Sequence, residues 1–514
     1  MSQLFVILFA FFVQFTDKAG SEHIALSELA LKKRAERNIA IDSLDYAVSP
    51  VYIDSLRKVG CSIYHTSRWM NGATVETTNA IIDQVKQWSF VDTVYLTRTT
   101  NATFGKPSVS LRKRIVEDSS IEIFPLDTNQ ANLQLQQLNL PRLHTAGFHG
   151  QGITIAVIDG GFQNADTLVA FDAVREQILG AYDLTDDSDN FYGSTGSHGT
   201  KCFSTIAAIT SNYTGAATKA NYYLIRSEEN YTESPKEMDN WVAAIELSDS
   251  LGVDITSTSL GYAMFDEQQF TLSYSDMDGQ ATRSSRTATI ASRKGMLVVV
   301  AAGNEGDKTW HYITSPADAD SILTVGAIDV LTNEIAKFSS WGPTADGRVK
   351  PEVCAVGKGT ALINPIDNSV VFGNGTSFAC PIIAGMAACL WSALPDASNM
   401  EIRERIIQSS SLYNTPHDQY GYGIPDVWQA YNNTNSASPH IETQPSAEKI
   451  LIDGQLWIIH EGYLYNIMGQ KKGKADYIAP LQPLTLASIK TWGSSEGAGR
   501  VGLTLRRCKG TAFF

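Results

Sequence analysis

Residues 150–161 read GQGITIAVIDGG, an unbroken apolar run that ends in Asp159, Gly160 and Gly161. A short apolar run between glycines is typical of a strand that is buried on both faces. Similar runs follow, separated by stretches with helical spacing, at 219–227, 252–262, 295–306 and 319–329. Strands that alternate with helices predict an α/β fold, a doubly wound and mostly parallel sheet. Sites in such sheets lie at the carboxyl ends of the strands, so the polar residues that end these runs are the first candidates for chemistry.

The composition indicates a folded chain. Of its 514 residues, 43% are hydrophobic and 18% are charged, which excludes a disordered protein. The formal net charge is −14, and a protein that binds nucleic acid normally needs a basic face, so we expect no nucleic-acid partner. Only residues 4–15 approach a membrane-length apolar run, so we expect no stable membrane span.

The six cysteines are widely separated and form no C-x-x-C pair, and the histidines show no metal-ligand spacing. Most of the cysteines stand in apolar runs, as Cys380 and Cys389 do, which favours buried free thiols over disulfides or metal ligands. We therefore predict no metal site. The acidic cluster before residue 198 lacks the spacing of a calcium-binding EF-hand loop and is interpreted as a solvated loop: Asp183, Asp186, Asp187 and Asp189.

The N-terminal run from Leu4 to Phe15 has two interpretations. Its length suits the apolar core of a signal peptide, so residues 1–15 are taken as an incomplete signal segment. The same residues also fit a buried strand that ends at the turn-like 17–20.

Residues 12–100 are predicted to form a ferredoxin-like β-α-β-β-α-β unit. The expected strands lie at 11–17, 61–67, 70–77 and 91–99, and the expected helices at 25–38 and 78–88. Residues 101–130 are polar and irregular and are interpreted as a linker.

Three local motifs carry candidate catalytic residues. Asp159 ends its strand, His198 stands at the start of a helix in GSHGTKCFSTIAA (196–208), and Ser377 stands at the start of an apolar helix in FGNGTSFACPIIAGMAA (372–388). Helix capping also favours Asp and Ser at such positions, so each motif alone has a structural explanation. Together they suit a serine nucleophile, an imidazole base and a carboxylate that orients the base.

A fourth motif, in GMLVVVAAGNEG (295–306), places Asn304 at another strand end. Its side-chain amide could donate to an oxyanion beside the backbone N–H of Ser377.

These four motifs, in this order, resemble the signatures of the subtilisin-like serine proteases. The resemblance covers roughly 130–432 and includes YGYGIPDVWQA (420–430), which is similar to the segment that closes the catalytic domain. It implies a serine endopeptidase that acts through an acyl-enzyme, with Asn304 as oxyanion donor and substrate contacts from Ser259, Leu260 and Gly261 on a strand. Cys202 and Cys380 replace residues usual in the family and suggest sensitivity to thiol reagents. Structural calcium occurs in this family, no cofactor is required, and the sequence leaves calcium open here.

The flanking segments also resemble parts of secreted bacterial subtilases. Residues 12–100 are similar to the propeptide that helps such proteases to fold and inhibits them. LWIIHEGYLYNIMGQKK (456–472) resembles the C-terminal sorting tails of exported Bacteroidetes proteins. The predicted organisation ends with a catalytic domain, a linker and a tail, at 131–432, 433–448 and 449–514, and the alternating pattern at 456–472 predicts a small β segment in the tail.

The sequence thus predicts a secreted or cell-surface bacterial protease whose partners are protein or peptide substrates and its own propeptide. The alternative is an inactive binding or adhesion module on the same fold. A degraded enzyme would usually have lost one of the four motif residues, and all four are present. An esterase or lipase is disfavoured because the candidate residues follow the chain order Asp, His, Ser, whereas such enzymes have the order Ser, Asp, His.

Overall fold

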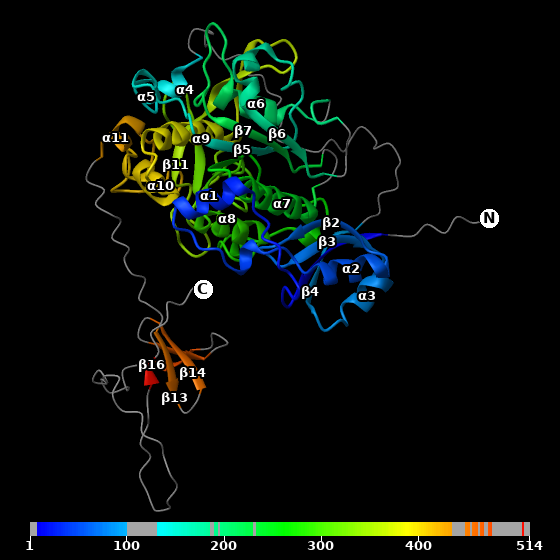
Figure 1. Ribbon diagram of the computed structural model, residues 1–514. Coiled ribbons are helices and arrows are strands. Elements are labelled where there is room, and N and C mark those ends of the chain that lie inside the picture. The colour runs from blue at the N-terminus through cyan, green and yellow to red at the C-terminus, as the bar shows by residue number, and fades with distance from the viewer. Residues whose placement is uncertain are drawn as a thin grey trace, which may run out of the picture. The chain divides into compact units, whose positions relative to one another are not determined.

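The computed structural model describes residues 8–99, 131–185, 190–193, 196–229 and 233–433, and short strands between 448 and 507 (Figure 1). Residues 1–433 form one compact unit, and 434–514 form another.

The larger unit is built on an eight-stranded sheet in the order β12-β11-β10-β9-β8-β5-β7-β6. Its neighbouring strands are parallel except for β12, which runs antiparallel to β11. The predicted α/β class is confirmed. The strands are β5 (Thr154–Asp159), β6 (Ile178–Asp183), β7 (Asn221–Arg226), β8 (Ile255–Thr258), β9 (Leu297–Ala301), β10 (Leu323–Asp329), β11 (Val353–Ile363) and β12 (Val370–Asn374).

The sequence analysis missed β6, β11 and β12. Both outer strands, β6 and β12, are largely half-exposed, so neither forms a continuous apolar run. Strand β11 is buried almost throughout, but Gly357, Lys358 and Gly359 interrupt its apolar pattern and resemble a turn.

Helices cover both faces of this sheet, as alternating side chains require. Ile155 and Val157 of β5 join a core that includes most of α9, whereas Ala156 and Ile158 face the opposite core with Trp241 of α7. The larger helices are α6 (His198–Ala207), α7 (Pro235–Leu251), α8 (Arg283–Arg293), α9 (Thr376–Ala393) and α10 (Asn399–Gln408). The shorter ones are α4 (Leu133–Gln136), α5 (Leu140–Thr145), α11 (Val427–Asn432), η3 (Val169–Gln177), η4 (Gln268–Phe270) and η5 (Tyr274–Asp276).

Helix α9 is the one described helix that is long and apolar enough to cross a membrane, but 89% of that stretch is buried inside the fold. Its apolarity is therefore explained by its place in the core, where it packs on β8, β9, β10 and β11.

The first part of the larger unit, residues 9–99, is called the N-terminal unit here. It is built on a four-stranded antiparallel sheet in the order β2-β3-β1-β4. It comprises β1 (Phe9–Phe15), α1 (Glu28–Glu36), η1 (Ser43–Asp45), α2 (Pro50–Val59), β2 (Ser62–Ser67), β3 (Gly72–Thr77), α3 (Asn79–Val85) and β4 (Val91–Thr99). Strand β1 pairs with both β3 and β4, and Phe11, Val13 and Phe15 are buried in the core of the unit. Residues 9–15 are therefore a central strand, which corrects their assignment to a signal segment, and residues 1–7 lie outside the described range.

The helix expected at 25–38 does not pack as predicted. The helix between the first two strands that joins the core of the unit is α2, which the sequence analysis missed and which buries Ile53 and Leu56. Helix α1 instead lies beside α7 (Figure 1). Its buried residues are Ala30 and Arg34, which are too few for an apolar stripe. The main contact of α1 is made by the charged side chain of Arg34.

The second unit contains a five-stranded antiparallel sheet in the order β16-β15-β14-β13-β17. Its strands are β13 (Glu448–Ile452), β14 (Gln455–His460), β15 (Tyr463–Asn466), β16 (Lys471–Lys474) and β17 (Arg506–Arg507). A small β unit was expected here, and its likeness to a sorting tail stays a prediction. The predicted linkers at 101–130 and 433–448 lie almost wholly outside the described residues.

Candidate active site

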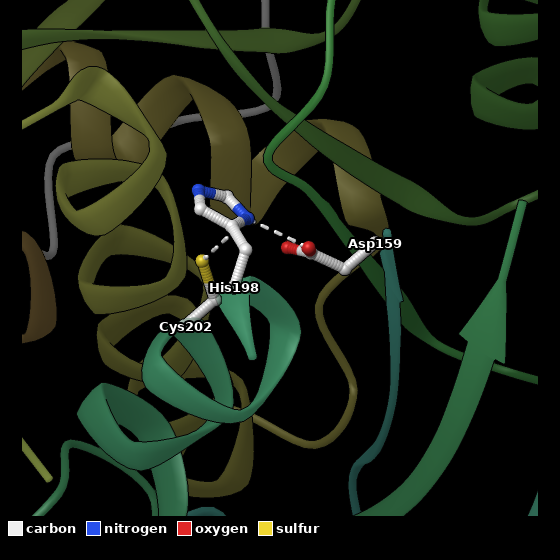
Figure 2. Close-up of side chains that lie close together, drawn as sticks. All are labelled: Asp159, His198 and Cys202. Carbon is white, nitrogen blue, oxygen red and sulfur yellow. Dashed lines mark hydrogen bonds and ion pairs between the residues drawn. The ribbon is translucent and has the colours of Figure 1, made fainter. Parts of the chain in front are cut away.

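Asp159 and His198 meet where β5 ends and α6 begins (Figure 2). The Nδ1 atom of His198 lies 2.7 Å from Oδ1 of Asp159, which also accepts a 2.7 Å hydrogen bond from the N–H of Gly160. Gly199 allows this approach, because a Cβ there would lie 2.6 Å from the carbonyl oxygen of Gly161. Asp159 is 0% exposed and His198 is 7% exposed, so the pair is held away from bulk water.

The carboxylate of Asp159 decides which tautomer of His198 is present. A carboxylate oxygen only accepts hydrogen bonds, so Nδ1 must carry the proton and donate it to Asp159. The other ring nitrogen, Nε2, then has a free lone pair. This arrangement gives the imidazole the form that a general base needs.

Ser377 is the second residue of α9, and the preceding Gly375 has a φ of 148°, a conformation that favours glycine. Pro381 stands four residues later and has no N–H to offer the carbonyl of Ser377. That carbonyl instead accepts hydrogen bonds from the Ser259 hydroxyl at 2.7 Å and from the Cys202 thiol at 3.3 Å. The start of α9 is thereby fixed to the end of β8 and to α6.

The hydroxyl of Ser377 donates to the carbonyl oxygen of Ser259 at 3.3 Å, and within the described residues it makes no hydrogen bond to His198. Such bonds are often long or unformed without substrate and tighten in the complex. A hydrogen bond from Ser377 to Nε2 of His198 would require the Ser377 side chain to adopt a different rotamer.

Asn304 follows β9 and is held by Thr376. Its Oδ1 atom accepts two 2.9 Å hydrogen bonds, one from the backbone N–H and one from the hydroxyl of Thr376. A backbone N–H can only donate, so the oxygen must face Thr376, and the amide nitrogen points the other way. Asn304 and Ser377 line the same cavity, which places an N–H donor beside the hydroxyl.

Cys202 lies under the imidazole, with Sγ 3.7 Å from Nδ1 of His198 (Figure 2). It is 0% exposed, and burial raises the pKa of its thiol well above the ordinary value, with the charge of Asp159 acting in the same direction. The thiolate is the reactive form, so the structure opposes the thiol-reagent sensitivity suggested by the sequence. All five described cysteines are buried and free, as predicted.

The candidate residues surround one cavity of about 120 Å³. Those predicted from the sequence that line it are Asp159, His198, Ser259, Leu260, Gly261, Asn304 and Ser377. The structure thus brings all of them together. The expected strand at 259–262 is absent, because β8 ends at Thr258 and only an isolated bridge joins Tyr262 to Ser315.

The cavity also has walls that the sequence analysis missed, namely Glu228, Glu233, Glu305 and Thr314. Glu228 and Glu233 lie between the end of β7 and the start of α7. No motif marks them, although their position after a strand end was a usable signal.

The clusters of described residues with metal-ligand geometry are the Asp159–His198–Cys202 group and a group formed by Glu228, Glu233 and Glu237. Glu237 already accepts hydrogen bonds from the backbone N–H groups of Ser234 and Glu229, at 3.0 and 2.9 Å. In the acidic cluster weighed for calcium, Asp186, Asp187 and Asp189 lie outside the described residues.

Comparison with known proteins gives two family matches. Residues 150–423 match the model of the subtilase family, and residues 10–113 match a peptidase S8 propeptide domain of Bacteroidota. Subtilisin E of Bacillus subtilis is 28% identical over 303 residues, which cover 58% of this chain and 70% of that protein. The serine protease AprX of the same species is 28% identical over 50% of this chain and 60% of its own length. A thermostable alkaline protease of Halalkalibacterium halodurans is 28% identical over 57% of this chain and 71% of its own length.

Proposed function

The chain belongs to the subtilase family and is a serine-type peptidase, and from this premise we propose that it cleaves internal peptide bonds through an acyl-enzyme on Ser377. The observation that carries the proposal is the meeting of four separate elements at one cavity. Its wall contains Asp159 from the end of β5, His198 from the start of α6, Ser377 from the start of α9 and Asn304 from the segment after β9.

In the proposed mechanism, the Ser377 hydroxyl attacks the scissile carbonyl while Nε2 of His198 takes its proton. Asp159 keeps Nδ1 protonated and stabilises the imidazolium that forms. The imidazolium then gives the proton to the leaving amine, the C–N bond breaks, and an ester to Ser377 remains. Water, deprotonated by the same imidazole, hydrolyses that ester and restores the hydroxyl.

The negative charge on the carbonyl oxygen needs donors at the moment of attack. The backbone N–H of Ser377 lies in the first turn of α9, where no carbonyl within the helix can accept it. The amide nitrogen of Asn304 supplies the second donor, because Thr376 fixes its orientation. One such side-chain donor typically contributes roughly 3–4 kcal/mol to the transition state.

The N-terminal unit acts in this proposal as the propeptide, consistent with its family match. It packs on α7 through β1, β2, β4 and α1, and the contact is rich in ion pairs. Arg68 lies 2.7 Å from Asp249, and Lys33 lies 2.7 Å from Asp254. Secretion stays a prediction, and the match to a domain defined for Bacteroidota supports a bacterial source.

One variant, Ser377→Ala, distinguishes the proposed peptidase from the alternative, an inactive binding module. Ser377→Ala should remove hydrolysis of a denatured protein substrate and leave the folded structure unchanged by circular dichroism. Thr289→Ala removes a buried hydroxyl of α8 outside the cavity, so it is the control and should keep activity. Equal hydrolysis by the parent and Ser377→Ala would refute the mechanism. Absence of hydrolysis by the correctly processed parent would favour the binding module.

A further inference from the structure

We propose that Ser259 and Cys202 are positioning residues for the nucleophile, because their side chains hold the backbone carbonyl of Ser377. This inference deepens the proposed function and rests on it. The two side chains donate to that carbonyl from different elements, Ser259 from the segment after β8 and Cys202 from α6. The inference is carried by the geometry of these bonds, by the burial of both donors, and by the missing helical donor at Pro381.

The carbonyl of Ser377 finds no donor in the next turn of its own helix. Within α9 its partner would be the N–H of the residue four positions later, which is Pro381 and has no N–H. The proline ring also crowds that carbonyl and disfavours the ordinary helical position of its oxygen. A buried acceptor without a partner costs free energy, so the position of Ser377 depends on contacts from outside α9.

Two buried side chains supply the missing donors. The hydroxyl oxygen of Ser259 lies 2.7 Å from the carbonyl oxygen of Ser377, and the thiol sulfur of Cys202 lies 3.3 Å from it. Ser259 is 6% exposed and Cys202 is 0% exposed, so little water competes for either bond. Burial raises the pKa of the Cys202 thiol well above its ordinary value, so the sulfur keeps the proton that it donates at neutral pH. We call this pair of donors the carbonyl clamp.

The carbonyl clamp holds the chain on one side of the nucleophile, and Asn304 holds it on the other. The backbone N–H and the hydroxyl of Thr376 both donate to Oδ1 of Asn304 at 2.9 Å. Because planar peptides leave two soft torsions per residue, these two attachments set where the N–H and the hydroxyl of Ser377 lie. Misplacement of reacting atoms by about 1 Å can lower a rate by roughly a hundredfold. Loss of the clamp should therefore slow catalysis.

The clamp acts without a contact between Cys202 and the substrate. Cys202 lies beside the imidazole of His198 and is not among the described residues that line the cavity (Figure 2). Ser259 does line the cavity, but its hydroxyl is donated to the carbonyl of Ser377. Cys202 also belongs to an apolar cluster with Leu362 and Phe378, so a test must separate packing from positioning.

The test compares Cys202→Val with Cys202→Ser in the processed enzyme. Valine keeps an apolar side chain in the cluster but has no donor, whereas serine keeps a donor but places a hydroxyl against apolar neighbours. If Cys202 served packing alone, valine would be the better replacement in every measurement. The clamp predicts opposite orders: Cys202→Val should have the higher thermal unfolding midpoint, and Cys202→Ser should have the higher kcat.

The expected losses depend on how many donors remain on the carbonyl. With one donor left, in Cys202→Val or Ser259→Ala, kcat for a chromogenic peptide should fall roughly tenfold at unchanged KM, and the double variant should lose roughly a hundredfold or more. The value of kcat is expressed per active site titrated with a serine-directed phosphonyl reagent, so unfolded molecules are not counted. The control Cys389→Val removes a buried thiol of α9 that donates to the carbonyl of Ala216 at 3.1 Å outside the cavity, and it should leave kcat unchanged.

Three results would overturn the inference. The first is a kcat for Cys202→Val that equals or exceeds that of Cys202→Ser. The second is a loss in Ser259→Ala that is confined to KM, since the hydroxyl would then act on the substrate. The third is an equal loss of kcat in the control Cys389→Val. Failure of the proposed function is distinguishable, because Ser377→Ala would then continue to hydrolyse the peptide.

Discussion

Arg34 is predicted to anchor the N-terminal unit to α7 and to the end of α8, and Arg34→Met should measure that anchor. The guanidinium is 3% exposed and donates to Asp45 at 3.1 Å, to both oxygens of Asp249 at 2.8 Å, and to the carbonyl of Lys294 at 2.7 Å. Methionine keeps much of the side-chain volume and removes the charge and these donors.

The loss in the free energy of unfolding depends on the partners that Asp45 and Asp249 keep in Arg34→Met. Removing one partner of a buried ion pair typically costs about 3–5 kcal/mol, because the other charge stays buried and uncompensated. Here Asp249 keeps Arg68 at 2.7 Å, and Asp45 keeps Lys294 at 2.7 Å. The cost should therefore fall near the low end, at about 3 kcal/mol. Burial already raises the pKa of Asp249 while Arg34 and Arg68 lower it, so the variant should raise it further.

The assay is urea unfolding of the full chain in the Ser377→Ala background, which prevents self-cleavage. Lys32→Met is the matched control on the same helix. Lys32 and Glu36 form a 3.7 Å pair whose side chains are 70% and 59% exposed, and such surface pairs contribute less than about 1 kcal/mol. If Arg34→Met unfolds within about 0.5 kcal/mol of the parent, or no differently from Lys32→Met, the anchoring role is wrong.

Two further predictions concern the active site and pH. Asn304→Ala should lower kcat by roughly a hundred- to a thousandfold in steady-state peptide hydrolysis, with little change in KM, because the lost donor acts in the transition state; a change confined to KM would contradict this role. His65 of β2 forms hydrogen bonds with the carbonyl of Leu184 at 2.9 Å and with Oδ1 of Asn240 at 3.1 Å. Its pKa is lowered from 6.5, chiefly by burial. The charge of Lys236 also lowers this pKa, whereas the charge of Asp239 raises it. The folded chain therefore binds fewer protons than the unfolded chain at acidic pH. The contribution of His65 to folding stability is present above about pH 6.5 and is lost as pH falls toward its lowered pKa. A pH series of unfolding midpoints should show this loss in the parent and not in His65→Gln.

The sequence predicted the active site better than it predicted the N-terminal unit, for physical reasons. Asp159, His198, Asn304 and Ser377 each stand at the end of a strand or near the start of a helix, and parallel strands bring such ends to one edge. Their meeting could therefore be inferred before any contact was known.

The missed features depend on contacts between distant segments. The role of α1 is set by Arg34 and its partner Asp249 on α7, which local periodicity does not reveal. Strand β1 looked like a signal segment because burial between two neighbouring strands also produces a continuous apolar run. Glu228 and Glu233 follow a strand end but stand in no motif, so only the folded chain shows that they line the cavity.

The central claim is that Ser377 is the nucleophile, and covalent labelling tests it most directly. The processed enzyme is treated with a serine-directed phosphonyl reagent, and the modified residue is located by mass spectrometry of its peptides. The account predicts one phosphonyl group on Ser377, loss of activity in proportion to labelling, and greatly slowed labelling in Asp159→Asn, where the carboxylate that orients His198 is gone. Labelling of another serine, or full activity after complete labelling of Ser377, would contradict it.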